Sequence, residues 1–548
     1  MGYDDVITHL GEFGPYQKRI YYLLCLPAIV CAFHKLAGVF LLAKPDFRCA
    51  LPYENGSSYE LSPHLWNLSY PQDERCAYYD VEYTEEYLNG SLARTTNATK
   101  SCSRYVYDRS KYLNSAVTEW DMVCNRSLLS ATSDSLFMLG VLLGSFIFGQ
   151  MSDKLGRKPT FFASLVLQLI FGVLAAVAPE YFSYTISRMI VGATTSGVFL
   201  VAYVIALEMV GSSYRLFAGV AMQMFFSVGF MLTAGFAYFI HDWRWLQIAL
   251  TLPGLLFICY YWIIPESARW LLMKGRQEEA FVIIKKAAKE NRVEIPSEIY
   301  EQLVEEVAEK KKLDEQTASQ PAATVFDLLR YPNLRRKTLL IFFDWFVNSG
   351  VYYGLSWNTN NLGGNQLVNF VISGAVEIPA YTLLLFTLNR WGRRSILCGT
   401  MLIAGVSLLA TIFVPSDMNW LIIACAMIGK LAITSSYGTI YIFSAEQFPT
   451  VVRNVGLGAS SMVARVGGIL APYLKLLGEI WRPLPLIICG ALSLIAGLLS
   501  LLLPETLNKP MPETIEDGEN FGKKQAPQDA AEEGGTQELD GMLNGKSS

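Results

Sequence analysis

The sequence DKLGRK occupies residues 153–158, and a similar stretch, NRWGRR, occupies residues 389–394, at an offset of 236 residues. Each stretch follows a long apolar run. Two other patterns recur at nearly the same offset. Glu208 with Arg215 is matched by Glu446 with Arg453, and Pro265-Glu266-Ser267 by Pro504-Glu505-Thr506. Three pairs near one offset predict that the chain is a duplication of one structural unit.

The apolar runs predict twelve membrane helices. A bilayer core of about 30 Å needs roughly 20 apolar residues per helix, and the chain is 52% hydrophobic and only 17% charged. The predicted helices are 20–43, 128–150, 159–178, 184–207, 215–240, 245–264, 337–357, 367–388, 396–414, 420–443, 454–477 and 483–503. Two six-helix halves in the same orientation are typical of a transporter whose halves rock about a central site. We therefore expect an all-α membrane protein of two six-helix halves.

The predicted domains follow from these helices and from two hydrophilic insertions. They are an N-terminus (1–19), a first half (20–264) that includes a large loop (44–127), a charged insertion between helices 6 and 7 (265–336), a second half (337–503) and a polar, disordered tail (504–548).

The short loops differ in basic charge. One side carries Lys154, Arg157, Lys158, Arg215, Arg390, Arg393, Arg394 and Arg453, and the other carries only Arg244 and Arg482. Because basic loops stay in the cytoplasm, both termini and the 265–336 insertion are predicted to be cytoplasmic. The large loop after helix 1 is then extracellular.

Glycosylation sequons support this orientation independently. All five, at Asn55, Asn67, Asn89, Asn97 and Asn125, fall in the large loop or at its end. The same segment contains Cys49, Cys76, Cys102 and Cys124, which suit two disulfides with three possible pairings. We expect a multi-pass protein of the plasma membrane whose extracellular loop could also join copies of the chain.

Several motifs resemble known transporters. GQMSDKLGRK (149–158), LNRWGRRS (388–395) and PESARWL (265–271) resemble the signature loops of the major facilitator superfamily. GEFGPYQKRI, VTEWDMVC, DWRWLQIALTLPG, SAEQFPTVVRNVG and LLPETLNKPMPET resemble the organic cation and carnitine transporters of that superfamily. The resemblance runs from residue 1 to about residue 515. It implies polyspecific transport of small organic ions, organic cations or zwitterions such as carnitine, by alternating access.

The duplicated loops supply a candidate cytoplasmic gate. Basic residues at these helix ends can pair with nearby acids when the inner side closes, although helix-end charges also serve topology. The candidate gate residues are Asp153, Arg157, Glu208, Arg215, Glu266, Arg390, Arg394, Glu446 and Arg453.

Charged residues inside predicted helices mark a candidate cavity. Each costs at least about 2.5 to 3.5 kcal/mol on insertion scales, so it should face protein or water. Lys35, Asp344, Glu377, Lys430 and Arg465 are in this position, and Glu377 could pair with Lys430 or Arg465. Aromatic faces can hold an ammonium by cation–π attraction. The resemblance assigns Phe199, Tyr203, Gln223, Phe226, Trp345, Tyr352 and Glu377 to the cavity, and charge and aromatic character add Tyr353, Lys430 and Arg465.

Two cavity positions depart from the cation carriers that the chain resembles. Arg465 stands where those carriers have an aspartate, and Asn348 where they tend to have an acid. Since a guanidinium grips a carboxylate with two hydrogen bonds, a zwitterion would suit Glu377 and Arg465 with the aromatic faces, and simple cations are less well served, so the expected substrates are organic cations, zwitterions or both. Organic anions are the alternative.

Other functions are disfavoured. No GxxxxGK[ST] loop is present, so we expect no ATP-driven pumping. The four histidines are scattered, which argues against a metal site, a cofactor or an enzyme. A net charge of −4 without a basic block argues against nucleic acid. The expected partners are the bilayer and a small organic ion, and a coupling ion is a further candidate. A receptor that has lost transport remains the rival hypothesis.

Overall fold

The computed structural model describes residues 3–54, 58–71, 75–88, 96–296, 298–305, 308–309, 324–415 and 417–522. Within these residues, ten helical stretches are long and apolar enough to cross a membrane. Two more helices complete the predicted twelve. The first is α17 (Pro332–Trp357), which buries the polar Lys337, Asp344 and Asn348. The second is α23 (Leu484–Ser500), which has 17 residues, whereas the ten stretches have 20 to 32.

The first half contains the six predicted spans in order. They are α2 (Pro15–Leu36) with α3 (Gly38–Leu41), α7 (Ser127–Leu155), α8 (Arg157–Ala176), α9 (Tyr181–Met209), α10 (Arg215–Phe239), and α11 (Trp243–Thr251) with η3 (Leu252–Cys259) and α12 (Tyr260–Ile263). The second half contains α17, α18 (Gln366–Ala375) with α19 (Glu377–Trp391), α20 (Arg393–Ala410), α21 (Asn419–Gln447), α22 (Arg453–Ile480) and α23.

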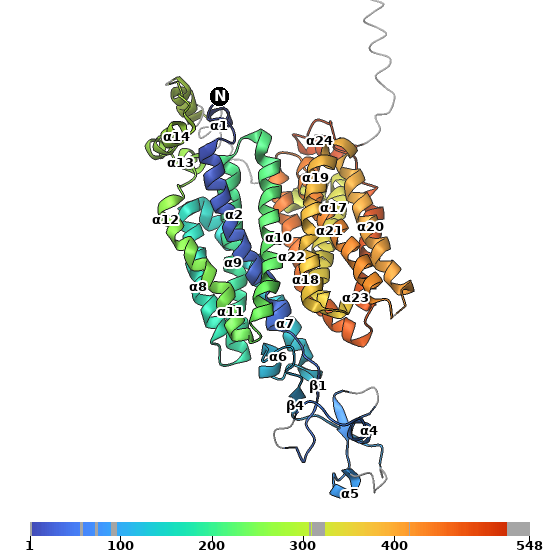
Figure 1. The fold of residues 1–548 in the computed structure, drawn as a ribbon. Helices are drawn as coiled ribbons and strands as arrows, with labels where there is room; N and C mark the ends of the chain where they lie inside the picture. Colours follow the sequence, from blue (N-terminus) through green and yellow to red (C-terminus); the bar gives the residue numbers. More distant parts are fainter. Residues whose placement is uncertain are drawn as a thin grey trace, which may run out of the picture.

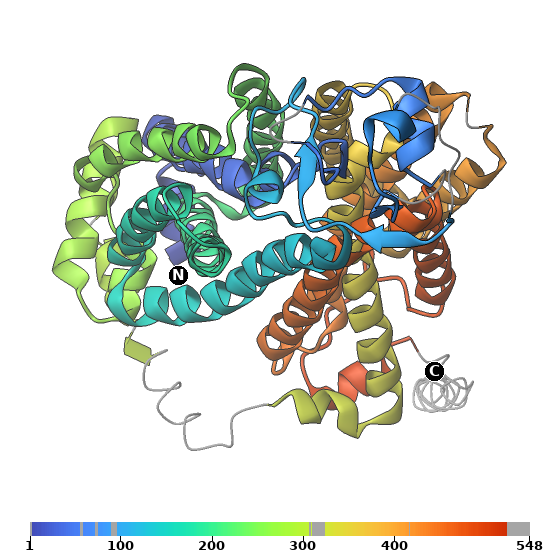
Figure 2. The ribbon, with the colours of Figure 1, turned by 90° about the horizontal axis from the view of Figure 1, so that it is seen from below.

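The two halves lie side by side as separate bundles (Figures 1 and 2). They meet along two seams, where α7 packs against α22 and α10 packs against α18 and α19. Residues 44–127 lie at one end of the bundles and the duplicated loops at the other (Figure 1). We call these the outer and inner ends, after the orientation predicted from the loop charges.

The eighth span is broken at its middle. α18 ends at Ala375 and α19 starts at Glu377, with Val376 between them. Pro379 explains the break, because a proline ring clashes with the carbonyl four residues earlier, which here belongs to Ala375. The break places Glu377 at a helix start in the middle of the span, where transporters with discontinuous helices bind their ligands.

The outer segment is a small disulfide-bonded unit. Strand β1 (Phe47–Cys49) pairs antiparallel with β4 (Tyr105–Tyr107), and β2 (Ala77–Tyr79) pairs with β3 (Thr99–Ser101). Of the three possible pairings, the structure has Cys49–Cys102 and Cys76–Cys124. Its other elements are the short helices α4 (Pro63–Ser69), α5 (Glu85–Leu88) and α6 (Ala116–Glu119).

Three sequon asparagines lie in the described part of this segment. Asn67, Asn97 and Asn125 are all exposed, so each is accessible to a glycan. Asn55 and Asn89 lie outside the described residues. Glycosylation at the five sites stays a prediction.

The insertion and the tail dock on the inner end. The N-terminal helix α1 (Tyr3–His9) and the insertion helices α13 (Ala268–Met273) and α14 (Gln277–Asn291) gather at the inner end of the first half, at the top of Figure 1. The Asn291 amide donates to the Leu10 carbonyl at 2.8 Å and accepts from the Tyr16 N–H at 2.9 Å. The insertion resumes with α16 (Val325–Arg330), which leads into α17.

The start of the tail differs from the disorder expected for 504–548. Residues through 522 are placed, and α24 (Ile515–Asn520) lies against α17. The Glu519 carboxylate accepts from the N–H groups of Asn333 and Leu334 at the α17 N-terminus. An acid at a helix N-terminus is stabilised there, and composition alone does not reveal that docking. Residues 523–548 lie outside the described residues.

The disulfide pairing gives a first test. Each bridge closes a loop of about 50 residues, which corresponds to roughly 4 kcal/mol in the chain-entropy model. We expect Cys76→Ser and Cys124→Ser to reduce surface delivery equally, and the double variant to be no worse than either. Mass mapping of non-reduced peptides should recover 49–102 and 76–124, and recovery of 49–76 would contradict the pairing.

The contact between the outer segment and α11 gives a pH test. The Glu119 carboxylate accepts from Trp243 Nε1 at 2.8 Å, from Asn114 Nδ2 at 3.2 Å and from the Arg244 guanidinium. Burial raises the pKa of Glu119, but the hydrogen bonds from Arg244, Trp243 and Asn114 outweigh it and leave the pKa below its ordinary value.

A carboxyl group whose pKa is lowered in the folded state stabilises the folded protein at pH values above its ordinary pKa. That stabilisation is lost as the pH falls through the lowered pKa. We expect hydrogen exchange of residues 115–122, corrected for intrinsic pH effects, to speed up at acidic pH. In Glu119→Gln, this acceleration of hydrogen exchange at acidic pH should be absent. An identical acid response in the variant would rule out Glu119 as its source.

Candidate functional site

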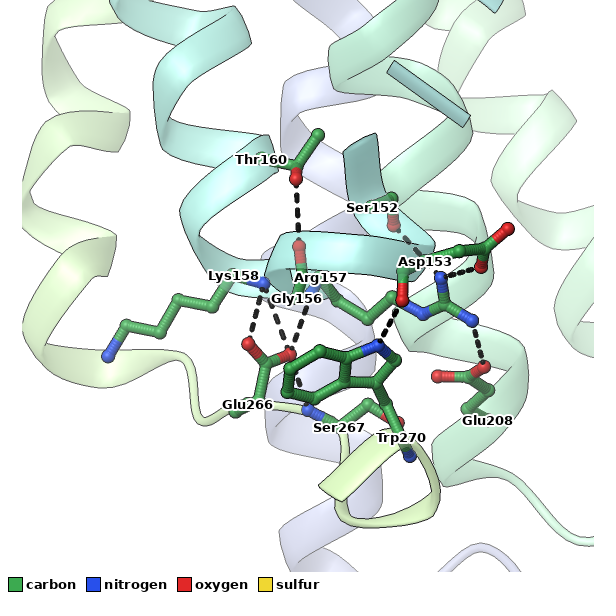
Figure 3. Close-up of polar contacts among 10 residues, drawn as sticks. All are labelled: Ser152, Asp153, Gly156, Arg157, Lys158, Thr160, Glu208, Glu266, Ser267 and Trp270. Atoms are coloured by element: carbon green, nitrogen blue, oxygen red, sulfur yellow. Dashed lines mark hydrogen bonds and ion pairs between the residues drawn. The ribbon is translucent and has the colours of Figure 1, made fainter. Parts of the chain in front are cut away.

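The loop between α7 and α8 is held by a network of charges (Figure 3). Gly156 turns the chain with φ of 116°, a left-handed conformation that favours glycine. The Arg157 guanidinium then bonds the Asp153 carboxylate, Ser152 Oγ at 3.1 Å and the Glu208 carboxylate at 3.1 Å. The network ties the inner ends of α7, α8 and α9 together.

Glu266 caps the N-terminus of α8. Its carboxylate accepts from the N–H groups of Arg157 at 3.0 Å and Lys158 at 3.1 Å. Trp270 closes the network from below, because its Nε1 donates to the Asp153 carbonyl at 3.0 Å (Figure 3). Unsatisfied N–H groups at a helix start favour a carboxylate, which explains why PES follows the sixth span.

The second half repeats this geometry. Gly392 has φ of 86°, Arg393 Nε lies 3.2 Å from the Glu446 carboxylate, and Glu505 accepts from the N–H groups of Arg393 and Arg394 at 2.9 and 3.0 Å. Burial raises the pKa of Glu505 and four backbone hydrogen bonds lower it, with a net result below the ordinary value. The duplication seen in the sequence is therefore also present in three dimensions.

The two loops differ at two equivalent positions. At the position equivalent to Asp153, the second half has Asn389. At the position equivalent to Trp270, it has Lys509. Without an indole to fill it, a cavity of about 200 Å³ remains beside Arg393, Glu446 and Lys509.

The remaining gate candidates lie apart from these pairs. Arg215 pairs with Asp4, and Arg453 donates to the Phe448 carbonyl at 3.3 Å. Arg394 donates to the Leu503 carbonyl, and Arg390 is exposed. Arg393 pairs with Glu446, although Arg393 is not among the gate residues predicted from the sequence. Its offset of 236 from Arg157 is the signal that identifies it.

Glu377 lies at the centre of a buried polar cluster between the halves. It accepts from Tyr352 OH at 2.6 Å, from Ser227 Oγ at 2.8 Å and lies 3.1 Å from Lys430 Nζ. Lys430 also donates to Ser356 Oγ at 2.5 Å. Both ionised side chains are fully buried, at 0% and 1% exposure. The Glu377–Lys430 pairing considered from the sequence is present, and Ser227 extends it into the first half.

Arg465 has a different environment. Its guanidinium bonds Ser461 on the same helix, its Nε has no partner, and no carboxylate lies within 4 Å among the described residues. Arg465 is partly exposed. It lies close enough to the hydroxyls of Tyr437 and Tyr441 to interact with them electrostatically. Arg465 is thus a cation without a protein anion.

Two groups of aromatic rings, one in each half, come together at Lys35. Phe199 stacks on Tyr203 at 6.3 Å and meets Phe226 edge-on at 6.1 Å. Tyr353, in the second half, contacts Tyr352 edge-on at 5.1 Å. The ammonium of Lys35 lies 5.7 Å from the Phe226 centroid and 5.2 Å from the Tyr353 centroid, so Lys35 spans the two aromatic groups.

The structure separates the other candidates by role. Trp345 is 1% exposed and donates to Ser444 Oγ at 2.8 Å, so it packs inside the second half. Gln223 is half-buried, one turn before Ser227. Sequence reasoning missed Tyr437 and Tyr441, although they follow Lys430 at helical spacing on one face of α21. Nothing in the sequence marked Ser227 or Ser356.

Polar contacts between the halves gather near the outer end. Ser135 Oγ donates to the Ile469 carbonyl at 2.7 Å, Thr132 Oγ1 lies 3.3 Å from Tyr473 OH, and Lys44 lies 2.8 Å from Glu479. Toward the inner end, α10 and α19 meet through apolar side chains. The ion pairs described above for the inner loops each stay within one half.

Two like helical bundles, with charged and aromatic side chains buried between them and paired loops at one end, define a membrane transporter of the major facilitator class. Comparison with known proteins supports the assignment to this class. A match to the family described as "Sugar (and other) transporter" spans residues 84–517. The inward open structure of the xylose transporter XylE from E. coli aligns with a TM-score of 0.62 at 16% identity, covering 92% of this chain and 100% of that one.

Proteins with similar sequences indicate which group of major facilitator transporters the chain belongs to. The chain is 93% identical over 547 residues to the "Organic cation transporter protein" of Drosophila melanogaster, with 100% of both chains covered. It is 36% identical to the Drosophila "Beta-alanine transporter", covering 95% of this chain and 89% of that protein. It is also 36% identical to human "Organic cation/carnitine transporter 2", covering 94% and 93%. The chain belongs to the organic cation and carnitine transporter family, whose members are transporters rather than enzymes.

The buried Glu377–Lys430 pair gives a stability test. Removing one partner leaves an uncompensated charge, at a cost of about 3 to 5 kcal/mol. We expect Lys430→Met to lower the thermal unfolding midpoint in detergent strongly. Glu377→Gln with Lys430→Met should recover most of the loss, because no buried charge remains. A double variant as unstable as the single one would contradict this pairing.

Proposed function

We propose that the protein carries small organic ions across the plasma membrane by alternating access, with the substrate bound between the halves near Arg465, Tyr353 and the Phe199–Tyr203 rings. The family and the two-half fold support this mechanism. The polar contacts between halves near the outer end, and ion pairs confined to each half at the inner end, support an inward-facing state.

In the proposed cycle, the inner loops act as two rigid clamps. Arg157 with Glu208 and Arg393 with Glu446 hold the inner helix ends of each half together, so that each half moves as one body. When the inner side closes, the outer contacts such as Lys44–Glu479 must separate. Throughout this cycle, both termini and the insertion face the cytoplasm, and the glycosylated segment faces outward.

The observation that carries the substrate class is the charge distribution of the cavity. Glu377 is neutralised by Lys430, whereas Arg465 has no carboxylate partner among the described residues. Since an unpaired guanidinium favours a carboxylate, we propose zwitterions as preferred substrates. The relatives named for carnitine and β-alanine support this, because both molecules carry an ammonium and a carboxylate. The sequence predicts that Glu377 pairs with the ammonium of the substrate, but the Glu377 carboxylate already pairs with Lys430.

Organic anions form the second candidate class, and the same unpaired Arg465 favours them. Simple cations, which the name of the Drosophila relative suggests, lack a free acid in this cavity. Uptake of labelled carnitine, an aromatic carboxylate and tetraethylammonium by cells that display the protein at their surface tests the proposal. No uptake of any of the three above control would refute transport and favour a receptor role.

Arg465→Asp tests the role of the guanidinium. The change replaces an attraction for carboxylates with a repulsion, so carnitine and aromatic carboxylate uptake should fall by at least about tenfold, which is roughly 1.4 kcal/mol. Tetraethylammonium uptake should rise. Arg465→Lys, which keeps the charge but loses the two-pronged geometry, should be intermediate. An unchanged substrate profile in Arg465→Asp would remove this residue from the site.

A further inference from the structure

Lys35 occupies an unusual position for a charged residue in the first membrane span. Its ammonium lies 5.7 Å from the Phe226 centroid in α10 and 5.2 Å from the Tyr353 centroid in α17. Phe226 belongs to the first half and Tyr353 to the second. A single tethered ammonium therefore fills the cation–π position between the halves that a substrate's ammonium would otherwise take.

No protein anion neutralises this ammonium. Among the described residues, no carboxylate lies within 4 Å of Lys35, and the nearby intramembrane acids are engaged elsewhere. Glu377 pairs with Lys430, Asp344 accepts from Ser500 Oγ at 2.8 Å, and Asp134 lies 3.8 Å from Arg188. Lys35 is only partly buried.

Tyr353 connects Lys35 to α22, the helix that carries Arg465. The Tyr353 ring lies beneath the Lys35 ammonium and packs against α22 at Gly468, one turn after Arg465. A methyl group at Gly468 would come within 3.3 Å of that ring, so the two helices approach closely here. Tyr353 therefore lies between the Lys35 ammonium and the helix that carries Arg465, and among the described residues neither cation has a carboxylate within 4 Å.

We propose that Lys35 is a substrate-binding residue that receives, together with Arg465, the carboxylate of a zwitterionic or anionic substrate and denies the Phe226–Tyr353 position to simple cations. This inference rests on the proposed transport function. It places the ammonium of a zwitterion away from Lys35, toward the Phe199–Tyr203 rings, which adjoin Phe226 at 6.1 Å.

The test compares Lys35→Met with Lys35→Arg. Methionine keeps most of the side-chain volume without charge, whereas arginine keeps the charge. We expect Lys35→Met to lower kcat/KM for carnitine and an aromatic carboxylate by about tenfold, the size expected when one charge-assisted hydrogen bond is lost. Tetraethylammonium uptake should rise, since the aromatic position becomes vacant. Lys35→Arg should keep the wild-type order of substrates.

The outcomes separate this inference from the proposed function. If the wild type transports none of the three probes, the transport proposal fails. If the wild type transports carnitine but Lys35→Met has the same profile at equal surface expression, only the role of Lys35 fails. Wild-type preference for tetraethylammonium over both carboxylates would also overturn it.

Chemical rescue covers the case in which Lys35→Met folds poorly. In Lys35→Cys, 2-aminoethyl methanethiosulfonate rebuilds a lysine-like ammonium on the thiol, whereas methyl methanethiosulfonate adds a neutral group. Carboxylate uptake should recover with the amine reagent alone. Recovery with both reagents, or with neither while the protein is at the surface, would overturn the role of Lys35. Wild-type protein treated with each reagent controls for the native cysteines, of which Cys259 is exposed.

Discussion

The cost of placing a charge inside a bilayer determines how this protein is built. Each charged side chain within a span must face protein or water, and the structure meets that requirement in two ways. Glu377 and Lys430 neutralise each other in a fully buried cluster that also holds Ser227, Tyr352 and Ser356. In the part of the chain that the structure describes, Lys35 and Arg465 have no carboxylate within 4 Å. The first arrangement joins the halves, and the second leaves charge available for a ligand.

The same constraint shapes the ends of the halves. At the inner end, the paired arginines and glutamates lie at the membrane boundary, where charges are easier to accommodate. Two further carboxylates, those of Glu266 and Glu505, cap helix starts there. Because the bonds stay within each half, they stiffen the halves without locking them together. The contacts that do cross between halves are fewer and lie mainly near the outer end, which suits a structure that must separate there.

Duplication does not make the halves equivalent. The first half fills its inner network with Trp270, whereas the second half has Lys509 there and keeps a cavity. The broken eighth span, with Glu377 after the break, has no counterpart in α7, which runs unbroken from Ser127 to Leu155.

The sequence by itself determined the twelve spans, the two halves and the transporter class. Hydrophobic length, loop charge and a repeat offset are local or periodic properties, and a bilayer converts them directly into topology. The sequence also marked Lys35, Glu377, Lys430 and Arg465 as costly charges. Only the tertiary structure decided which of them pair. Lys430 reaches Glu377 across a gap of 53 residues while Arg465 does not, because partner choice depends on how helices face one another. The tertiary structure likewise selected Arg393 over Arg394 for Glu446, fixed the disulfide pairing in the outer segment and brought Lys35 between two aromatic rings from different halves.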